Sequence, residues 1–258
     1  MGFDVGAAAY GRFMGRYSEP LAEQFLGTVA ETVGVPPHGR ALDVGCGPGA
    51  LTAPLVARLG VDAVAAVDPS ESFVAAARSR FPGLSVHVAA AESLPFADDA
   101  FDLTLAQLVV PFMTDPVAGL TEMARVTRPG GVVAASVWDH AGGGGPLGVF
   151  WRAVRDVDPS ATDESHQSGA RAGQLATLFR AAGLRDVVPW SETVTAGYGS
   201  FEEWWETFTL GVGPAGSYVA GLAAHERDVL RSRCAQLLPA GPFEVTAVAW
   251  CARATPPA

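Results

Sequence analysis

Three glycines alternate with other residues in the stretch ALDVGCGPGA, residues 41–50, directly after a short apolar run. Glycine permits positive φ and lets a ligand approach the main chain closely. The loop 45–49 therefore suits a nucleotide-type cofactor, which binds at such turns between a strand and a helix. Asp68 ends the next apolar run. A carboxylate there can accept hydrogen bonds from both hydroxyls of a ribose, although it could also cap the following helix.

The glycine spacing bears on which cofactor is bound. Dinucleotide loops read GxGxxG and face a pyrophosphate. Here Gly45, Gly47 and Gly49 form GxGxG, preceded by the acidic Asp43. This order suits a cofactor that carries a positive charge and lacks a pyrophosphate. A NAD-dependent oxidoreductase stays open as an alternative, because the loop and Asp68 alone would also suit NAD.

Strands and helices alternate along the chain and must position these residues. Helical spacing is expected over 7–33, 50–60, 70–81 and 170–182, in a helix and turn over 115–131, and in an insert over 201–238. Apolar runs predict strands over 40–45, 62–68, 84–91, 101–109, 131–138, 184–196 and 243–254. Continuous apolar strands joined by helices are typical of a doubly wound α/β fold with a mostly parallel sheet.

Composition narrows the class of protein further. A chain of 258 residues fits one domain, and a net charge of −10 argues against a nucleic-acid partner. No run of about 20 apolar residues could span a bilayer. The cysteines are odd in number and lack close pairing, which favours a reducing cytoplasm. The histidines lack ligand spacing, so no metal site is expected.

Five ordered motifs, LDVGCGPG, VDPS, AAAESLPFADDAFD, AQLVVPFMTDP and EMARVTRPGG, lie within about residues 40–138. With them the chain resembles the class I S-adenosylmethionine-dependent methyltransferases, in the small-molecule branch of the ubiquinone/menaquinone-biosynthesis enzymes (methyltransferase type 11). The resemblance implies a Rossmann-like sheet of seven strands, the last antiparallel. It also implies S-adenosylmethionine as cofactor, S-adenosylhomocysteine as product, and a small-molecule methyl acceptor.

The resemblance assigns cofactor roles to several positions. Those around the methionine half are Asp43, Gly45, Cys46, Gly47 and Gly49. Asp68 would hold the ribose, and Pro69 and Ser70 would lie near the adenine. Relatives usually place an acid before Ala-Glu after the third strand, and this chain has Ala90, Ala91 and Glu92 instead. Adenine would then rely on these three residues. Ala106 and Gln107 would contact the amino-acid end. Packing is the favoured interpretation of the Cys46 side chain, because nothing near it in the sequence would lower the pKa of its thiol.

The resemblance also suggests how the single domain, 1–258, is organised. Residues 1–38 would form an N-terminal helical lid, 39–140 the cofactor-binding core, and 141–258 the rest of the sheet. An insert over about 198–240 would roof the acceptor site, with Trp204 or Trp205 facing the pocket.

Methyl transfer is an in-line displacement that requires mainly alignment and exclusion of water. An oxygen or nitrogen nucleophile often needs a general base, and His140 is the candidate because it follows the fifth strand. Tyr10 and Tyr17 are second candidates for polar contacts to the acceptor. Each of the three could instead be an ordinary loop or packing residue. The leading hypothesis is methyl transfer to an O, N or C nucleophile. A non-catalytic cofactor-binding protein is a further alternative.

Overall fold

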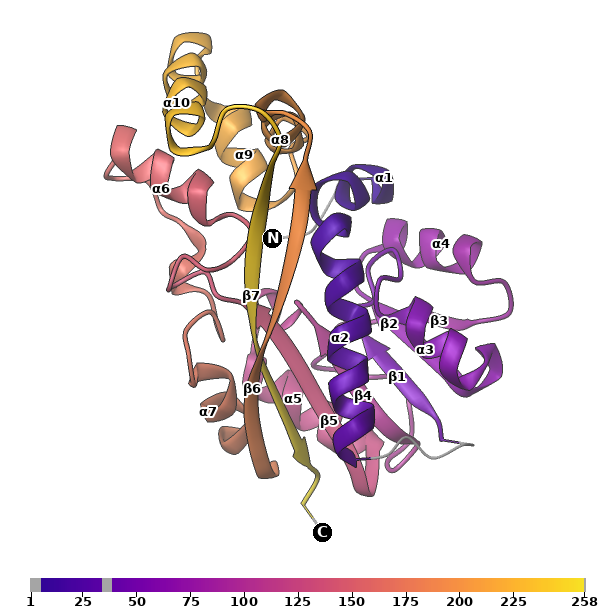
Figure 1. Ribbon diagram of the computed structural model, residues 1–258. Helices are drawn as coiled ribbons and strands as arrows, with labels where there is room; N and C mark the ends of the chain where they lie inside the picture. Colours follow the sequence, from indigo (N-terminus) through magenta and orange to yellow (C-terminus); the bar gives the residue numbers. More distant parts are fainter. Residues whose placement is uncertain (1–5, 34–38, 258) are drawn as a thin grey trace.

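The computed structural model describes residues 6–33 and 39–257, and a seven-stranded sheet forms its centre (Figure 1). The strands are β1 (Ala41–Val44), β2 (Val64–Asp68), β3 (Ser85–Val88), β4 (Phe101–Gln107), β5 (Thr127–Trp138), β6 (Arg185–Tyr198) and β7 (Phe243–Thr255). Their order is β3-β2-β1-β4-β5-β7-β6, with β7 antiparallel to both neighbours and the other pairings parallel. The predicted α/β sheet with one antiparallel last strand is confirmed.

Helices cover both faces of this sheet. They are α1 (Ala7–Tyr10), α2 (Arg16–Val33), α3 (Thr52–Leu59), α4 (Glu71–Arg80), α5 (Pro116–Val126), α6 (Gly148–Val157), α7 (Gln174–Ala181), α8 (Phe201–Phe208), α9 (Gly213–Gly221) and α10 (Ala224–Leu237). Shorter turns are the π-helical η1 (Gly11–Gly15) and the 3-10 helices η2 (Val61–Ala63), η3 (Val110–Phe112) and η4 (Glu164–His166). Helices α2 and α3 pack on one face, and α5 and α7 pack on the other.

Alternate residues of the central strands feed two separate cores. In β4, Leu103 and Leu105 belong to the core beneath α2 and α3, whereas Ala106 belongs to the core beneath α5 and α7. Successive side chains of a strand point to opposite faces, so a strand buried on both faces must be apolar throughout. This explains why the strands stand out in the sequence as continuous apolar runs.

The ends of the predicted elements differ in places from the structure. The N-terminal helical segment is interrupted by η1 and resumes as α2, with Pro20 inside it. The insert consists of α8, α9 and α10, which lie with α6 around the upper ends of β6 and β7 (Figure 1). Helix α6, Gly148–Val157, is not among the helices expected from the sequence. The predicted boundary at residue 38 lies outside the described residues.

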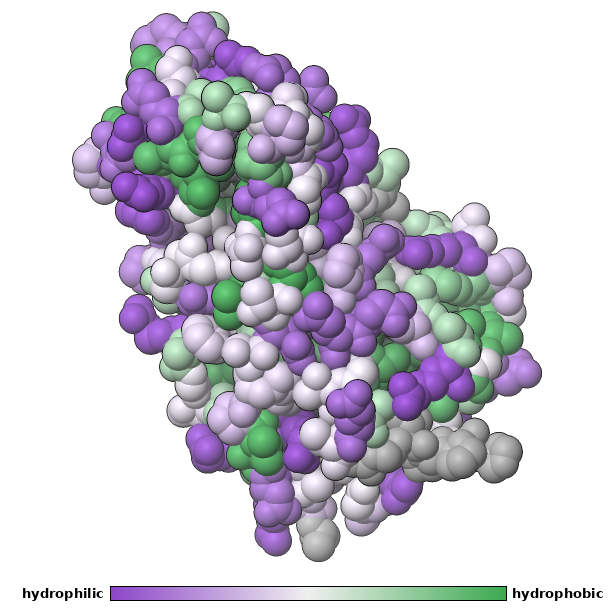
Figure 2. Space-filling model, in the orientation of Figure 1, coloured by the Kyte–Doolittle hydropathy of each residue, from purple (hydrophilic) through white to green (hydrophobic). Residues whose placement is uncertain are grey.

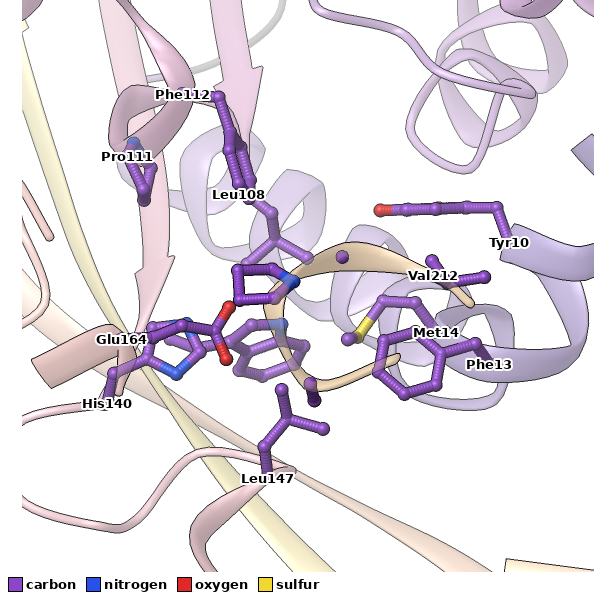
Figure 3. Close-up of a pocket in the computed structure, with 14 residues that line it drawn as sticks. Tyr10, Phe13, Met14, Leu108, Pro111, Phe112, His140, Leu147, Glu164 and Val212 are labelled. Carbon is purple, nitrogen blue, oxygen red and sulfur yellow. The ribbon is translucent and has the colours of Figure 1, made fainter. Parts of the chain in front are cut away.

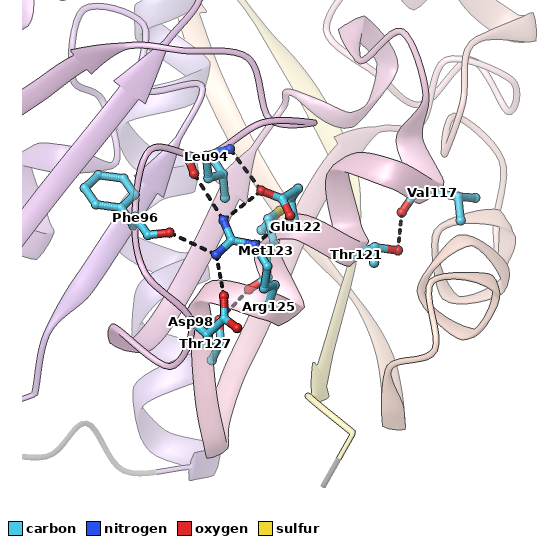
Figure 4. Close-up of polar contacts among 9 residues, drawn as sticks. All are labelled: Leu94, Phe96, Asp98, Val117, Thr121, Glu122, Met123, Arg125 and Thr127. Atoms are coloured by element: carbon cyan, nitrogen blue, oxygen red, sulfur yellow. Dashed lines mark hydrogen bonds and ion pairs between the residues drawn. The ribbon is translucent and has the colours of Figure 1, made fainter.

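Two of the sequence motifs meet in a structural contact. Arg125 on α5 donates to the carbonyls of Leu94 and Phe96 at 3.1 and 2.9 Å, and also contacts Asp98 and Glu122 (Figure 4). One guanidinium therefore fixes the loop after β3 against α5. These residues of AAAESLPFADDAFD and EMARVTRPGG stabilise the fold at a distance from the glycine loop.

The surface in Figure 2 is mainly hydrophilic or intermediate, with separate apolar patches. The large exposed apolar side chains lie on different elements: Val88, Phe112, Val157, Val188 and Val229. None of the helices in the described part of the chain has the length and apolar character needed to cross a membrane.

We predict that Gly45→Ala destabilises the protein more than Gly47→Ala does. Both glycines have positive φ, 70° and 52°, so each substitution should cost about 1–2 kcal/mol in backbone strain. A Cβ at Gly45 would also overlap the side chain of Val109, whereas one at Gly47 would meet nothing within 4 Å. Overpacking adds about 1–3 kcal/mol at Gly45 alone. Urea unfolding of both variants measures the difference, and equal losses of unfolding free energy would contradict it.

Candidate active site

The glycine loop leaves β1 in a tight turn with positive φ at Gly45, Gly47 and Gly49. The N–H groups of Gly45 and Cys46 donate to the carbonyl of Val67 at 2.8 and 2.9 Å. The loop is thereby held against the end of β2, and its main chain is left open to a ligand. Gly49 lies against Phe81, where a Cβ would overlap the ring.

Asp68, at the carboxyl end of β2, connects the glycine loop to α4. Its Oδ2 accepts from the N–H of Gly47 and its Oδ1 from the N–H of Ser70, both at 2.8 Å. The side chain is 6% exposed, and this burial raises the pKa of the carboxyl group, while the two N–H donors oppose the rise. Each carboxylate oxygen can accept more than one hydrogen bond, so both oxygens can still accept from a diol.

Asp43 is buried beneath the loop and faces α3. The hydroxyl of Thr52 donates to its Oδ2 at 2.6 Å. Burial raises the pKa of Asp43 to about 7, with the Thr52 bond acting in the opposite direction. A nearby cation would favour the ionised form of this carboxyl group.

Two polar atoms next to Asp43 have no partner. Gln107, at the end of β4, donates through Nε2 to the carbonyl of Ser18 at 2.8 Å. The Gln107 Oε1 and the Ser18 hydroxyl are buried without a hydrogen-bond partner in the described residues. Both residues line a small space of about 30 Å³ together with Asp43 and Cys46. Unpaired buried polar atoms are costly, so this space fits a ligand with polar ends.

A larger cavity of about 530 Å³ opens beside the loop, a size typical of small-molecule sites. Its walls include the predicted residues Gly45, Gly47, Asp68, Pro69, Ser70 and Gln107. The structure therefore brings together residues from the ends of β1, β2 and β4, as the sequence analysis expected.

Five residues with predicted cofactor roles line neither of these two spaces, and one of them is Gly49, which packs against Phe81. Ala90, Ala91 and Glu92 are not among the residues that line this cavity. Ala90 is exposed, Ala91 packs in the core, and Glu92 accepts from the N–H of Asp115 at 3.1 Å. Ala106 is fully buried within β4, beside Gln107. Their predicted contacts to adenine and to the amino-acid end stay predictions.

A second, apolar pocket adjoins the cofactor-sized cavity and shares Tyr10, Leu108 and Phe112 with it. The lining side chains include Phe13, Met14, Pro111, Leu147 and Val212, and converge on one space in Figure 3. His140 and Glu164 are the titratable groups on the side opposite Tyr10 (Figure 3). The pocket therefore combines apolar walls with a few polar atoms, as acceptor sites do.

The proposed catalytic residues occupy different positions. His140 lines the pocket, and burial lowers the pKa of its imidazole to about 4. Tyr10 lies where the two spaces meet, and burial together with the Asp68 charge raises its pKa to about 12. Tyr17 lines neither space. Its hydroxyl pairs with that of Tyr198 at 2.9 Å within the core, which matches the packing reading.

Other residues differ from the sequence expectation. Trp204 and Trp205 are both buried against Phe208 and do not line the pocket. Residues 212–215, at the start of α9, line it instead. Glu164 and Trp138 also line it, and sequence reasoning passed over both because neither lies in a recognisable motif. Cys46 is buried, and burial raises the pKa of its thiol, which fits packing rather than nucleophilic chemistry.

No group of three or more His, Cys, Asp or Glu residues is placed to hold a metal ion within 6–33 and 39–257.

The fold and the cavities define a Rossmann-like α/β protein. Residues 42–135 match the family described as a methyltransferase domain. An uncharacterized methyltransferase of Mycobacterium sp. is 30% identical over 212 residues, which cover 78% of this chain and 82% of that protein. The chain belongs to the family of S-adenosylmethionine-dependent methyltransferases.

Other relatives share the fold or part of the sequence. A demethylmenaquinone methyltransferase of Renibacterium salmoninarum is 31% identical over 59% of this chain and 64% of that protein. The chain spans 60–64% of the length of several curated relatives that it matches. A phosphoethanolamine N-methyltransferase of Haemonchus contortus, solved with S-adenosylhomocysteine, aligns with a TM-score of 0.56 at 16% identity, covering 96% of this chain and 59% of that chain.

The residues present fit the cofactor of this family. The glycine loop has a main chain that a ligand can approach closely, and the Asp68 oxygens and Gln107 Oε1 are hydrogen-bond acceptors. A ribose diol and an amino-acid ammonium group are donors of the kind that such acceptors require. The buried Asp43 supplies negative charge close by.

We predict that Asp68→Asn removes a preference for ribose. Wild-type protein should bind 5′-methylthioadenosine at least about tenfold more tightly than its 2′-deoxy form, since a hydrogen bond to a charged group contributes about 1.5–3 kcal/mol. In the variant this ratio should fall toward one. Calorimetric titration measures both ligands, and Asp62→Asn, at an exposed position, serves as the control. An unchanged ratio in Asp68→Asn would reject the ribose assignment.

Proposed function

We propose that this protein transfers the methyl group of S-adenosylmethionine to an O, N or C nucleophile of a small-molecule metabolite. The observation that carries the proposal is the meeting of two spaces at Tyr10, Leu108 and Phe112. One space has polar contacts suited to a nucleoside and an amino acid, and the other is an apolar pocket suited to an acceptor.

When bound, S-adenosylmethionine supplies a methyl group on a sulfonium that is already a good leaving group. The chain's part is then to bind, align and keep out water. Gly45, Gly47, Asp68 and Gln107 hold one side of the site. Phe13 and Met14 from η1 cover the other, which supports the lid role of the N-terminal segment. Residues 212–215 support the role of the insert as a roof.

His140 is the proposed general base. Its lowered pKa keeps the imidazole neutral at physiological pH, the form that accepts a proton. Tyr10 is the proposed polar contact at the junction of the two spaces. The acidic net charge of −10 supports a small-molecule acceptor over a nucleic acid. The unpaired cysteines support a location in a reducing cytoplasm.

Two alternative functions compete with methyl transfer, and the comparisons bear on only one of them. The family assignment gives no support to a NAD-dependent oxidoreductase. A non-catalytic cofactor-binding protein would share the same cavity, so activity must be measured directly.

We expect calorimetric titration to give binding of S-adenosylhomocysteine in the micromolar range or tighter and no measurable binding of NADH. Methyl transfer from labelled S-adenosylmethionine would then be assayed on a panel of small phenols, amines and carbon nucleophiles. Binding of NADH alone would overturn the proposal. Tight cofactor binding without transfer to any panel member would favour the non-catalytic alternative.

We predict that His140→Ala lowers kcat by about 10²-fold or more and leaves the affinity for S-adenosylhomocysteine unchanged. Because protonation inactivates a base, and the pKa of His140 is about 4, wild-type kcat should show no histidine-dependent loss between pH 8 and pH 5.5. His87→Ala is the control, since His87 lies on β3 and pairs with Ser85. Full activity of His140→Ala at every pH would exclude the base role.

A further inference from the structure

Glu164 is a buried carboxyl group in the apolar pocket. It begins η4 and is 5% exposed. Its Oε2 accepts from the indole N–H of Trp151 at 2.7 Å, whereas its Oε1 has no hydrogen-bond partner in the described residues. In Figure 3 the carboxyl group points into the pocket, beside His140. A carboxyl oxygen that lines an apolar pocket and has no donor from the protein can accept a hydrogen bond from a ligand, and such charge-assisted bonds are strong.

No cation of the described chain compensates Glu164. Arg155 pairs instead with the adjacent Asp163, at 2.5 Å. Burial raises the pKa of Glu164 to about 7, although the Trp151 bond opposes the rise. The carboxyl group is therefore largely ionised at pH 8, with one oxygen left to accept a hydrogen bond.

Trp138, at the end of β5, contributes a hydrogen-bond donor without an acceptor to the same pocket. It is 4% exposed and lines the space together with Glu164. Its Nε1–H is buried and has no hydrogen-bond partner within 6–33 and 39–257. An indole N–H only donates. The pocket thus contains one acceptor atom and one donor atom that the protein itself leaves unpaired.

We propose that Glu164 and Trp138 are the specificity-determining pair that recognises a neutral hydroxyl group on the acceptor. The hydroxyl donates its hydrogen to Glu164 Oε1, and its oxygen accepts from Trp138 Nε1. This inference rests on the proposed function and narrows its acceptor class. An ammonium group would balance the charge of Glu164, but it only donates and would leave the indole N–H unpaired, so benzylamine is the competitor that the test must include. An ether only accepts and would leave the carboxylate unpaired.

The size of the pocket sets which part of the acceptor enters. Its enclosed space is about 40 Å³, and a water molecule needs about 10–15 Å³ measured in this way. The space takes a hydroxyl and the few atoms that carry it. The shared wall of Tyr10, Leu108 and Phe112 leads from there to the cofactor cavity.

The test uses four monocyclic probes of similar size on the full chain, with S-adenosylhomocysteine present at pH 8. Phenol both donates and accepts, anisole only accepts, benzylamine carries an ammonium, and toluene does neither. We expect calorimetry to show phenol bound at least about tenfold more tightly than each of the others. Glu164→Gln and Trp138→Phe should each remove this preference and leave toluene binding unchanged. Glu244→Gln, at an exposed position on β7, should keep it.

Tighter binding of benzylamine than of phenol, or equal binding of all four probes, would overturn the inference. So would a phenol preference that survives in both Glu164→Gln and Trp138→Phe. The S-adenosylhomocysteine titration is read separately in every variant. A protein that binds no cofactor but still prefers phenol would reject the proposed function and leave this pair intact.

Discussion

The carboxylate of Asp68 carries the contact on which the rest of the site depends. Its two oxygens accept hydrogen bonds from the N–H groups of Gly47 and Ser70. Gly47 lies in the loop after β1, and Ser70 lies in the loop after β2. One buried side chain thus fixes the glycine loop relative to α4. Because these bonds are charge-assisted and shielded from water, they hold the loop more firmly than neutral bonds would. The cavity beside the loop keeps its shape for the same reason.

The parallel sheet turns that local contact into a site. Strands β1, β2 and β4 are neighbours and run in one direction, so Gly45, Asp68 and Gln107 meet at one edge although they are far apart in the sequence. Strand β5 ends at the same edge and contributes Trp138 and His140. The N-terminal helices and the start of α9 then cover this edge with apolar side chains. The site therefore has a polar half, lined by the strand ends, and an apolar half, lined by the N-terminal helices and the start of α9.

Much of the lining of the larger cavity could be predicted from the sequence, because it depends on main-chain conformation and on where the strands end. Glycine spacing indicates where the backbone can adopt positive φ, and an acidic residue after an apolar run indicates where a buried strand ends. Adenine contacts were harder to assign, since Ala90 and Ala91 offer no side-chain signal. The roles of Tyr17, Trp204 and Trp205 were also open. Aromatic residues at helical spacing look alike whether they face a core or a pocket, and here all three are buried in the core.

The sequence by itself determined the class of fold, the strands whose ends carry polar residues, and the family. These depend on local periodicity and on motifs of neighbouring residues. Only the tertiary structure decided which side chains share the apolar pocket. Glu164 lies in a short turn between α6 and α7, and Trp138 ends β5. Nothing near either residue in the chain indicates that both will line one apolar pocket. Long-range packing brings them together, and burial then changes the chemistry of Glu164 by depriving its carboxyl group of water.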